Sequence, residues 1–267
     1  ARFRRALSLA INRHEINQVL YYGFAQESAN TVLPDSPLYD DKRDKRWSQF
    51  DVKRANKLMD EIGLERGSNG VRLLPNGQPL EIIIESAGES TEETDVLELI
   101  RKTWGEIGVK LFTKPLQREV LRNRVFSGQT QMAIWFGLEN GLATPEMSPR
   151  ELAPTSQQQL HWPRWGQYWE TKGQAGAPVD MEIPKRLFAL FQQWQVATSD
   201  EERRGYWEEM LDLWTDEVYT IGVISGVLQP IVATKKLQNV PTDGFYNWDP
   251  GAHFGIFRPD RFWLSKK

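Results

Sequence analysis

Residues 80–112 read LEIIIESAGESTEETDVLELIRKTWGEIGVKLF, and this stretch predicts a strand, a helix and a second strand in succession. Residues 80–85 are mostly apolar, as in a strand. Ser90 and Glu93 then have the spacing of a capping box. Apolar residues follow at helical period, namely Val96, Leu97, Ile100, Trp104 and Ile107. Gly108 ends the helix and releases the chain into a strand at 109–112. Such alternation is typical of an α/β layer.

On the N-terminal side, apolar residues three or four apart between residues 3 and 20 predict a helical opening with one buried stripe up to Gly23. Asp51 can cap a helix that runs through Ile62. Residues 71–74 and 80–85 flank PNGQP, whose Asn-Gly pair favours a tight hairpin between two strands.

On the C-terminal side, we predict a second helix at 117–126 and a buried strand, QMAIWF, at 131–136. Helical and strand periodicity is then lost from residue 137 to residue 180. An unstructured segment of that length is uncommon in a compact domain and usually has a function.

The rest of the chain returns to regular patterns before an aromatic tail that starts near Asn239. Ser199 and Glu202 have capping-box spacing at the start of a helix. The helices and strands predicted here lie at residues 184–196, 199–217, 219–227 and 231–233.

Composition narrows the classes of protein. The 267 residues are 40% hydrophobic and 26% charged, which is ordinary for a globular protein. A net charge of -3 with no basic patch argues against nucleic acid as a partner. Cys is absent, which excludes disulfides and thiolate metal sites. Because the chain opens at helical spacing without a start signal, we expect a fragment of a longer protein.

Catalytic and metal-binding motifs are missing. The chain contains no nucleophile elbow, zincin helix or phosphate-binding loop. His14, His161 and His253 stand far apart without metal-ligand spacing. We therefore expect no enzyme activity, no cofactor and no metal site.

Residues 3–13, FRRALSLAINR, are similar to a helix of the form R-x-A-hydrophobic-x-x-A-I-D-R, with Asn12 in place of the usual Asp. Further segments follow in matching order, at Tyr39, 50–64, 75–80 and 104–109. Together they resemble the C-terminal half of bacterial extracellular solute-binding proteins of family 5, the group that contains dipeptide-, oligopeptide- and nickel-binding proteins.

The resemblance covers nearly the whole chain and implies its fold and domains. We expect an α/β lobe of the periplasmic binding protein type (type II, cluster C), with a mixed sheet flanked by helices. Residues 1–226 would form the second lobe. Residues 227–267 would return through a hinge near residues 225–231 and complete the first lobe, which this chain lacks.

It also implies a function. We expect the substrate-binding component of an ABC importer, which captures an oligopeptide or oligosaccharide-sized solute in a cleft between two lobes. Its partners would be the solute, the membrane permease subunits and the missing N-terminal lobe. The protein would be periplasmic or extracellular and would associate with the membrane through the transporter.

In peptide-binding members, the segment that matches residues 133–140 has a Trp and then an Asp that pairs with the peptide amine. Here it reads AIWFGLEN, so Trp135 matches the Trp, and Glu139 could supply the carboxylate beside Asn140. Alternatively, Glu139 is a solvated loop residue, as most acidic residues are.

Residues 161–169, HWPRWGQYW, interleave flat rings with a guanidinium and an amide. This combination suits sugar rings or peptide side chains. The candidate ligand contacts in this segment are Trp162, Arg164, Trp165 and Trp169. Alternatively, the rings fasten a long loop to the core, since Trp is highly buried on average.

Three alternatives remain open from the sequence. Arg118, Arg122 and Arg124 could meet a ligand carboxylate or could form a solvated helix face. A carbohydrate-active enzyme could use Glu139 in an aromatic-lined cleft. A protein-interaction domain could use the aromatic tail.

Overall fold

The computed structural model describes residues 1–245 and 258–265. Its centre is a three-stranded parallel sheet in the order β3-β2-β4. Strand β2 (Glu81–Ser86) pairs with β3 (Lys110–Pro115) along its whole length and with β4 (Met132–Ala133) near its end. The predicted α/β layer is confirmed, and the antiparallel strand pairs form separate ribbons.

Helices cover both faces of this sheet. Helix α5 (Thr91–Glu106) connects β2 to β3 and packs on the face that carries Ile82, Ile84 and Leu111. Helix α6 (Arg118–Phe126) connects β3 to β4, and its Arg124 reaches Glu85 on the other face. The two connections therefore leave neighbouring strands on opposite sides of the sheet.

The N-terminal segment forms two helices where one buried stripe was predicted. Helix α1 (Arg2–Leu9) ends at Ala10, and α2 (Arg13–Tyr21) begins after Asn12, whose side chain accepts a hydrogen bond from the backbone N–H of Glu15. The stripe prediction was wrong in its outer part, because Val19 is exposed. Helices α1, α2 and α5 pack with the sheet in the first of two hydrophobic cores. Helix α4 (Val52–Glu61) completes this first core and is capped by Asp51 as predicted.

Arg13, at the start of α2, is only 2% exposed. Its guanidinium donates to the backbone oxygens of Ser8 and Ser48 at 2.9 Å each and to Gly222 O at 3.0 and 2.6 Å. Burial lowers the pKa of Arg13 to about 10, so the group stays charged at neutral pH. Carbonyl oxygens thus satisfy this buried cation and tie α2 to residue 222.

A second core lies beside the sheet and is helical. It contains α8 (Glu182–Val196) and α9 (Asp200–Glu217), and the capping box of Ser199 and Glu202 is confirmed. The segment expected to lack structure contains a 3-10 turn (Arg150–Leu152) and α7 (Pro163–Glu170). Pro163 occupies the first helical position, where its missing N–H costs nothing.

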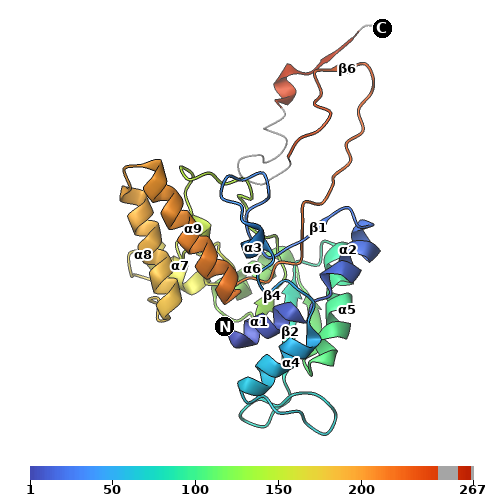
Figure 1. Ribbon diagram of the computed structural model, residues 1–267, viewed down its shortest axis with the longest axis vertical. Helices are drawn as coiled ribbons and strands as arrows, with labels where there is room; N and C mark the ends of the chain where they lie inside the picture. Colours follow the sequence, from blue (N-terminus) through green and yellow to red (C-terminus); the bar gives the residue numbers. More distant parts are fainter. Residues whose placement is uncertain (246–257, 266–267) are drawn as a thin grey trace.

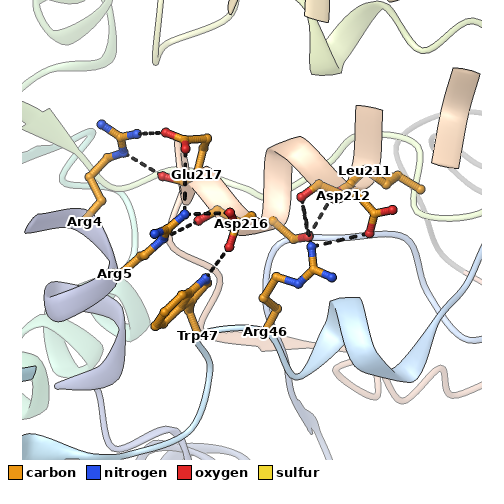
Figure 2. A network of polar contacts seen from close by, with 9 residues as sticks. Arg4, Arg5, Arg46, Trp47, Leu211, Asp212, Asp216 and Glu217 are labelled. Atoms are coloured by element: carbon orange, nitrogen blue, oxygen red, sulfur yellow. Dashed lines mark hydrogen bonds and ion pairs between the residues drawn. The ribbon is translucent and has the colours of Figure 1, made fainter. Parts of the chain in front are cut away.

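The two cores are joined by a group of polar residues that we name the α1–α9 clasp: Arg4, Arg5, Trp47, Asp216 and Glu217 (Figure 2). The two arginines of α1 donate to the side chains and backbone oxygens of the two acids at distances of 2.6–2.9 Å. Trp47 Nε1 donates to Asp216 at 2.9 Å. The guanidinium groups therefore satisfy carbonyls at the C-terminal end of α9, where positive charge is favoured.

Several predicted strands are shorter than expected because strands need partners. Residues 71–74 make isolated bridges only, although Leu74 N donates to Gln78 O and closes the predicted turn at 2.7 Å. Of residues 131–136, only the two of β4 pair. Of residues 219–227, only β5 (Ile224–Ser225) pairs, with β1 (Gln26–Glu27), and residues 231–233 form no strand.

After β5 the chain rises away from the body, as Figure 1 shows. Residues 226–236 are all exposed, and β6 (Leu237–Gln238) pairs with β7 (Trp263–Leu264) after a 3-10 turn (Pro259–Arg261). Phe245 and Trp263 of the predicted aromatic tail are exposed. Four other aromatic residues of that tail lie outside the described residues: Tyr246, Trp248, Phe254 and Phe257. The remaining short helix, α3 (Asp41–Asp44), contacts α9.

No helix among the described residues is both long enough and apolar enough to cross a membrane.

Candidate ligand-binding face

The carboxyl ends of β2 and β3 form the edge of the sheet at which the two connections diverge. Because α5 and α6 leave these neighbouring strands on opposite faces, a crevice opens between the two loops. A hollow of about 390 Å³ lies there, lined by residues 87–89 after β2 and residues 115–118 after β3. We name it the switch-point hollow.

Gly88 shapes this hollow. Its φ of +66° is a conformation that glycine adopts at no steric cost. A Cβ atom at this position would lie 3.3 Å from Leu116 O and 3.3 Å from the Cβ of Pro115. A side chain at residue 88 would therefore have to push the two loops slightly apart.

The rim of the hollow carries one ion pair. Arg118 Nε donates to the two carboxylate oxygens of Glu89 at 3.0 and 3.1 Å, and Nη2 also contacts that carboxylate. The Arg118 Cζ lies 5.2 Å from the centroid of the Trp135 ring. The guanidinium is thus held between a carboxylate and an aromatic face.

Trp135 and Phe136 follow β4 and differ in exposure. Trp135 is half-buried and packs on a small cluster that includes Leu121 and Val125 of α6. Phe136 is 79% exposed, and its ring stands 6.0 Å from that of Trp135 at an interplanar angle of 77°. Because Arg118 both lines the hollow and stacks on Trp135, the predicted site residue Trp135 lies next to the hollow.

Residues 137–140 are fixed by two polar side chains from elsewhere in the chain. Asn30 Oδ1 accepts from Leu138 N at 2.9 Å, and Glu151 accepts from the backbone N–H groups of Glu139 and Asn140 at 2.9 and 3.2 Å. Glu139 is exposed. The side-chain oxygen of Asn140 is buried, and no described residue donates to it.

Trp162 belongs to the second core. It is 3% exposed, and its ring contacts those of His161, Trp165, Trp214 and Tyr219. Its Nε1 donates to Gln159 at 2.8 Å. Trp162 therefore offers a ligand almost no surface in this structure and fastens the start of α7 to the core.

The other predicted contacts on α7 are more accessible. Arg164 is exposed and donates to Gly176 O at 3.3 Å. Trp165 is half-buried against the second core, and the exposed Trp169 packs edge-on against Phe188 at 4.7 Å. The structure thus places these rings on the helical core, whereas Trp135 packs on α6.

The three arginines of α6 have different surroundings. Arg124 pairs with the buried Glu85, and Arg122 donates to Gln158 at 2.9 Å. Arg118 alone lines the hollow.

Sequence patterns did not single out Glu89, Gly88 or Asn30. The two loops of the hollow are 26 residues apart in sequence, counted from 89 to 115, and they meet only because β2 and β3 are neighbours. Gly88 was the available signal, since it follows four residues after the end of the apolar run at Ile84. Within the described residues, no group of three His, Asp or Glu side chains could hold a metal ion.

Comparison with known proteins identifies the family. A sequence profile described as "Bacterial extracellular solute-binding proteins, family 5 Middle" matches residues 1–156. The dipeptide-binding protein of Escherichia coli (strain K12) is 28% identical over 141 residues, which are 52% of this chain and 24% of that protein.

Solved structures agree with this assignment. The oligopeptide-binding protein OppA superimposes with a TM-score of 0.78 at 27% identity, over 99% of this chain and 43% of OppA. The periplasmic binding protein MelB from Agrobacterium fabrum C58, in complex with stachyose, gives a TM-score of 0.70 at 16% identity, over 100% of this chain and 39% of MelB. The second likeness supports the fold alone.

The chain therefore spans less than half the length of these relatives. The fold is that of a periplasmic binding protein, as the sequence predicted. With more than half of its residues matched by the family profile, this chain belongs to the bacterial extracellular solute-binding proteins of family 5.

Proposed function

We propose that this chain is one lobe of the substrate-binding component of an ABC importer, and that it binds its solute at the switch-point hollow. The observation that carries the proposal is the position of the hollow, outside the carboxyl ends of two parallel strands whose connections diverge. Ligands of open α/β sheets collect at such points. The solute is of oligopeptide or oligosaccharide size, in line with the dipeptide- and oligopeptide-binding relatives and with the stachyose bound to MelB.

The other half of the cleft comes from a first lobe outside this chain. Residues 1–226 form the lobe described here, and residues 227–267 form the hinge return and part of the first lobe. The exposure of residues 226–236 supports this division, because a segment that crosses between two lobes has little core of its own. The ligand contacts predicted from the sequence, namely Trp135, Glu139, Asn140 and the exposed side chains of α7, are part of this proposal.

The whole protein works on the periplasmic or extracellular side of the membrane and hands its solute to the permease subunits. The two lobes close over the solute by a hinge motion. The closed protein then docks on the permease subunits. The protein performs no catalysis. Turnover of an oligosaccharide by the full-length protein would favour a carbohydrate-active enzyme instead. Aromatic side chains of the tail that stay exposed in the full-length protein would favour an interaction domain.

The test uses the full-length protein and fills the hollow. Gln117 is exposed, caps α6 without a side-chain hydrogen bond and lines the hollow, so Gln117→Trp adds bulk there at little cost in stability. We expect native mass spectrometry to find the ligand that the wild type carries from its own host and to find it missing from Gln117→Trp.

Lys57→Trp is the matched control. Lys57 lies on α4, is exposed, and is not among the residues that line the hollow. This variant should carry the same ligand as the wild type. If Gln117→Trp keeps the ligand at wild-type occupancy, the hollow is not the binding site.

A further inference from the structure

A group of exposed apolar side chains lies where residues 226–236 leave the body of the structure. Val19 is on the last turn of α2, Tyr22 caps that helix, and Phe24 follows two residues later. Val227 and Leu228 come directly after β5 and Gly226. We name these five residues the α2–linker patch. Tyr22 is 80% and Phe24 is 70% exposed, so the described residues leave most of both rings open to water.

The ribbon of β1 and β5 brings the two parts of the patch together. These strands are antiparallel, and Gln26 pairs with Ser225 at one end of the ribbon. Phe24 and Val227 each lie two residues beyond that pair, so both leave the ribbon at the same end. Figure 1 shows residues 226–236 rising from the body beside β1 and α2. The patch therefore adjoins the start of the linker.

The turn that carries the two rings is fixed by Asn17. This buried side chain donates to Ala25 O at 2.8 Å and accepts from Ala25 N at 3.2 Å. Tyr22 has a φ of +55°, which aromatic residues seldom adopt. Phe24 N donates to Tyr21 O at 2.9 Å. The backbone thus holds both rings in place, although no described residue covers them.

Charged side chains at neighbouring positions of α2 and β1 already have partners. His14 Nδ1 lies 2.9 Å from the carboxylate of Glu27, and Lys102 donates to Glu15 at 3.1 Å. The patch itself contains no charged residue. Such a surface suits an apolar partner, whereas a strongly charged protein or an anionic membrane surface is recognised by complementary charge.

The linker determines which partner reaches this surface most readily. Residues 226–236 span at most roughly 36 Å when extended, so a domain that they carry stays close to the patch. Tethering by a short linker gives an effective concentration on the order of millimolar. A second copy of the chain, or another protein, would have to compete with that concentration.

From these observations, and resting on the proposed function, we propose that the α2–linker patch is the surface on which the first lobe packs beside the hinge. An apolar face of the first lobe covers Tyr22 and Phe24. The two lobes are then joined by a packed contact as well as by the linker, and their hinge motion pivots about the end of α2.

Hydroxyl-radical footprinting of the full-length protein tests whether the patch is covered. Two tyrosines give an internal comparison, because Tyr22 is 80% exposed in this lobe and Tyr168 of α7 is 39% exposed. An uncovered patch would make Tyr22 the faster of the two to oxidise. We expect the reverse order, with Tyr22 the slower.

Two variants assign that protection to the patch. Phe24→Asp should restore fast oxidation of Tyr22, because it places an unpaired charge in an apolar contact. Val196→Asp is the matched control, since Val196 is also an exposed apolar residue but ends α8 in the helical core. It should leave the oxidation of Tyr22 slow.

A photo-crosslinker identifies what covers the patch. p-Benzoylphenylalanine replaces Phe24 in the full-length protein, or Val196 in the control, and mass spectrometry identifies the crosslinked peptides. We expect residue 24 to capture peptides of the first lobe within one molecule. Residue 196 should capture none of them.

Other results overturn the inference. Oxidation of Tyr22 that is faster than that of Tyr168 in the wild type would show an open patch. Crosslinks between two molecules would assign the patch to a second copy, and crosslinks that reach only residues 226–236 would assign it to the linker. Equal capture of first-lobe peptides from residues 24 and 196 would contradict a dedicated contact.

The carried ligand separates this inference from the proposed function. Native mass spectrometry detects that ligand independently of the patch. If the ligand is present while Tyr22 oxidises fast, the solute-binding function stands and the packing of the first lobe on the patch is wrong. If the hollow proves not to bind the ligand while residue 24 captures the first lobe, the binding site is wrong and the contact between lobes stands.

Discussion

Asn30 illustrates how much of this face depends on single residues. Its side-chain oxygen accepts from Leu138 N, its side-chain nitrogen donates to Thr220 at 2.7 Å, and its backbone oxygen accepts from Trp214 at 2.9 Å. Gly222 permits this arrangement, because a Cβ there would lie 2.2 Å from Asn30 N. One amide thus aligns the segment after β4 with the segment that leaves the lobe.

We therefore expect Asn30→Ala to lower the free energy of unfolding of the full-length protein by roughly 1–3 kcal/mol, since it leaves two hydrogen-bonding groups without partners. Urea denaturation measures this change. Asn123→Ala is the control, because Asn123 is exposed on α6 and should be neutral or slightly stabilising. Equal stability of Asn30→Ala and the wild type would show that water replaces both bonds without cost.

At the scale of elements, Glu85 joins β2 to α6 and to β3. Its carboxylate lies just below the surface and accepts from Arg124 at 2.9 Å, from Thr130 at 2.7 Å and from Lys114 at 3.4 Å. Desolvation by burial would raise the pKa of Glu85, but these hydrogen bonds outweigh it and the pKa is lowered. The ion pair between Arg124 and Glu85 orients α6 and therefore also Arg118, which begins this helix.

The lowered pKa gives a stability that depends on pH. The contribution of Glu85 is fully present above the ordinary glutamate value of 4.5 and is lost as pH falls through the lowered pKa of the folded state. We expect Glu85→Gln to destabilise the protein at pH 7 by roughly 1–3 kcal/mol. The difference from the wild type should shrink below pH 4.5. Chemical denaturation at several pH values measures it, and a difference that grows as pH falls would contradict this assignment.

Elements whose signals are local were predicted well from the sequence. Helices α4 and α9 begin directly after Asp51 and Ser199 because the caps that start them lie within three residues of their partners. The strands were overpredicted, since pairing depends on a distant segment: β4 stops after two pairs with β2. The same reason explains why the hollow escaped prediction and why Trp162, chosen as a ligand contact, lies in the core.

At the scale of the whole molecule, the proposed function makes the hollow one side of a binding site. Good sites bury roughly 70–90% of a small ligand, which an open lobe cannot do alone. The ligand is released from the full-length protein and titrated calorimetrically into that protein and into residues 1–267 alone. We expect residues 1–267 to bind it at least about a hundredfold more weakly, because about half the contacts are lost. That ratio corresponds to about 2.7 kcal/mol of binding free energy. Equal affinities would contradict the two-lobe proposal.

Arg13 has a mechanical consequence. Its buried guanidinium donates two hydrogen bonds to the carbonyl of Gly222, three residues before Ser225, the last residue of β5. These hydrogen bonds hold the segment that leads into β5 in place against α2. In the proposed two-lobe protein, a movement of the linking chain therefore acts on α2 through this contact as well as on β1 through β5.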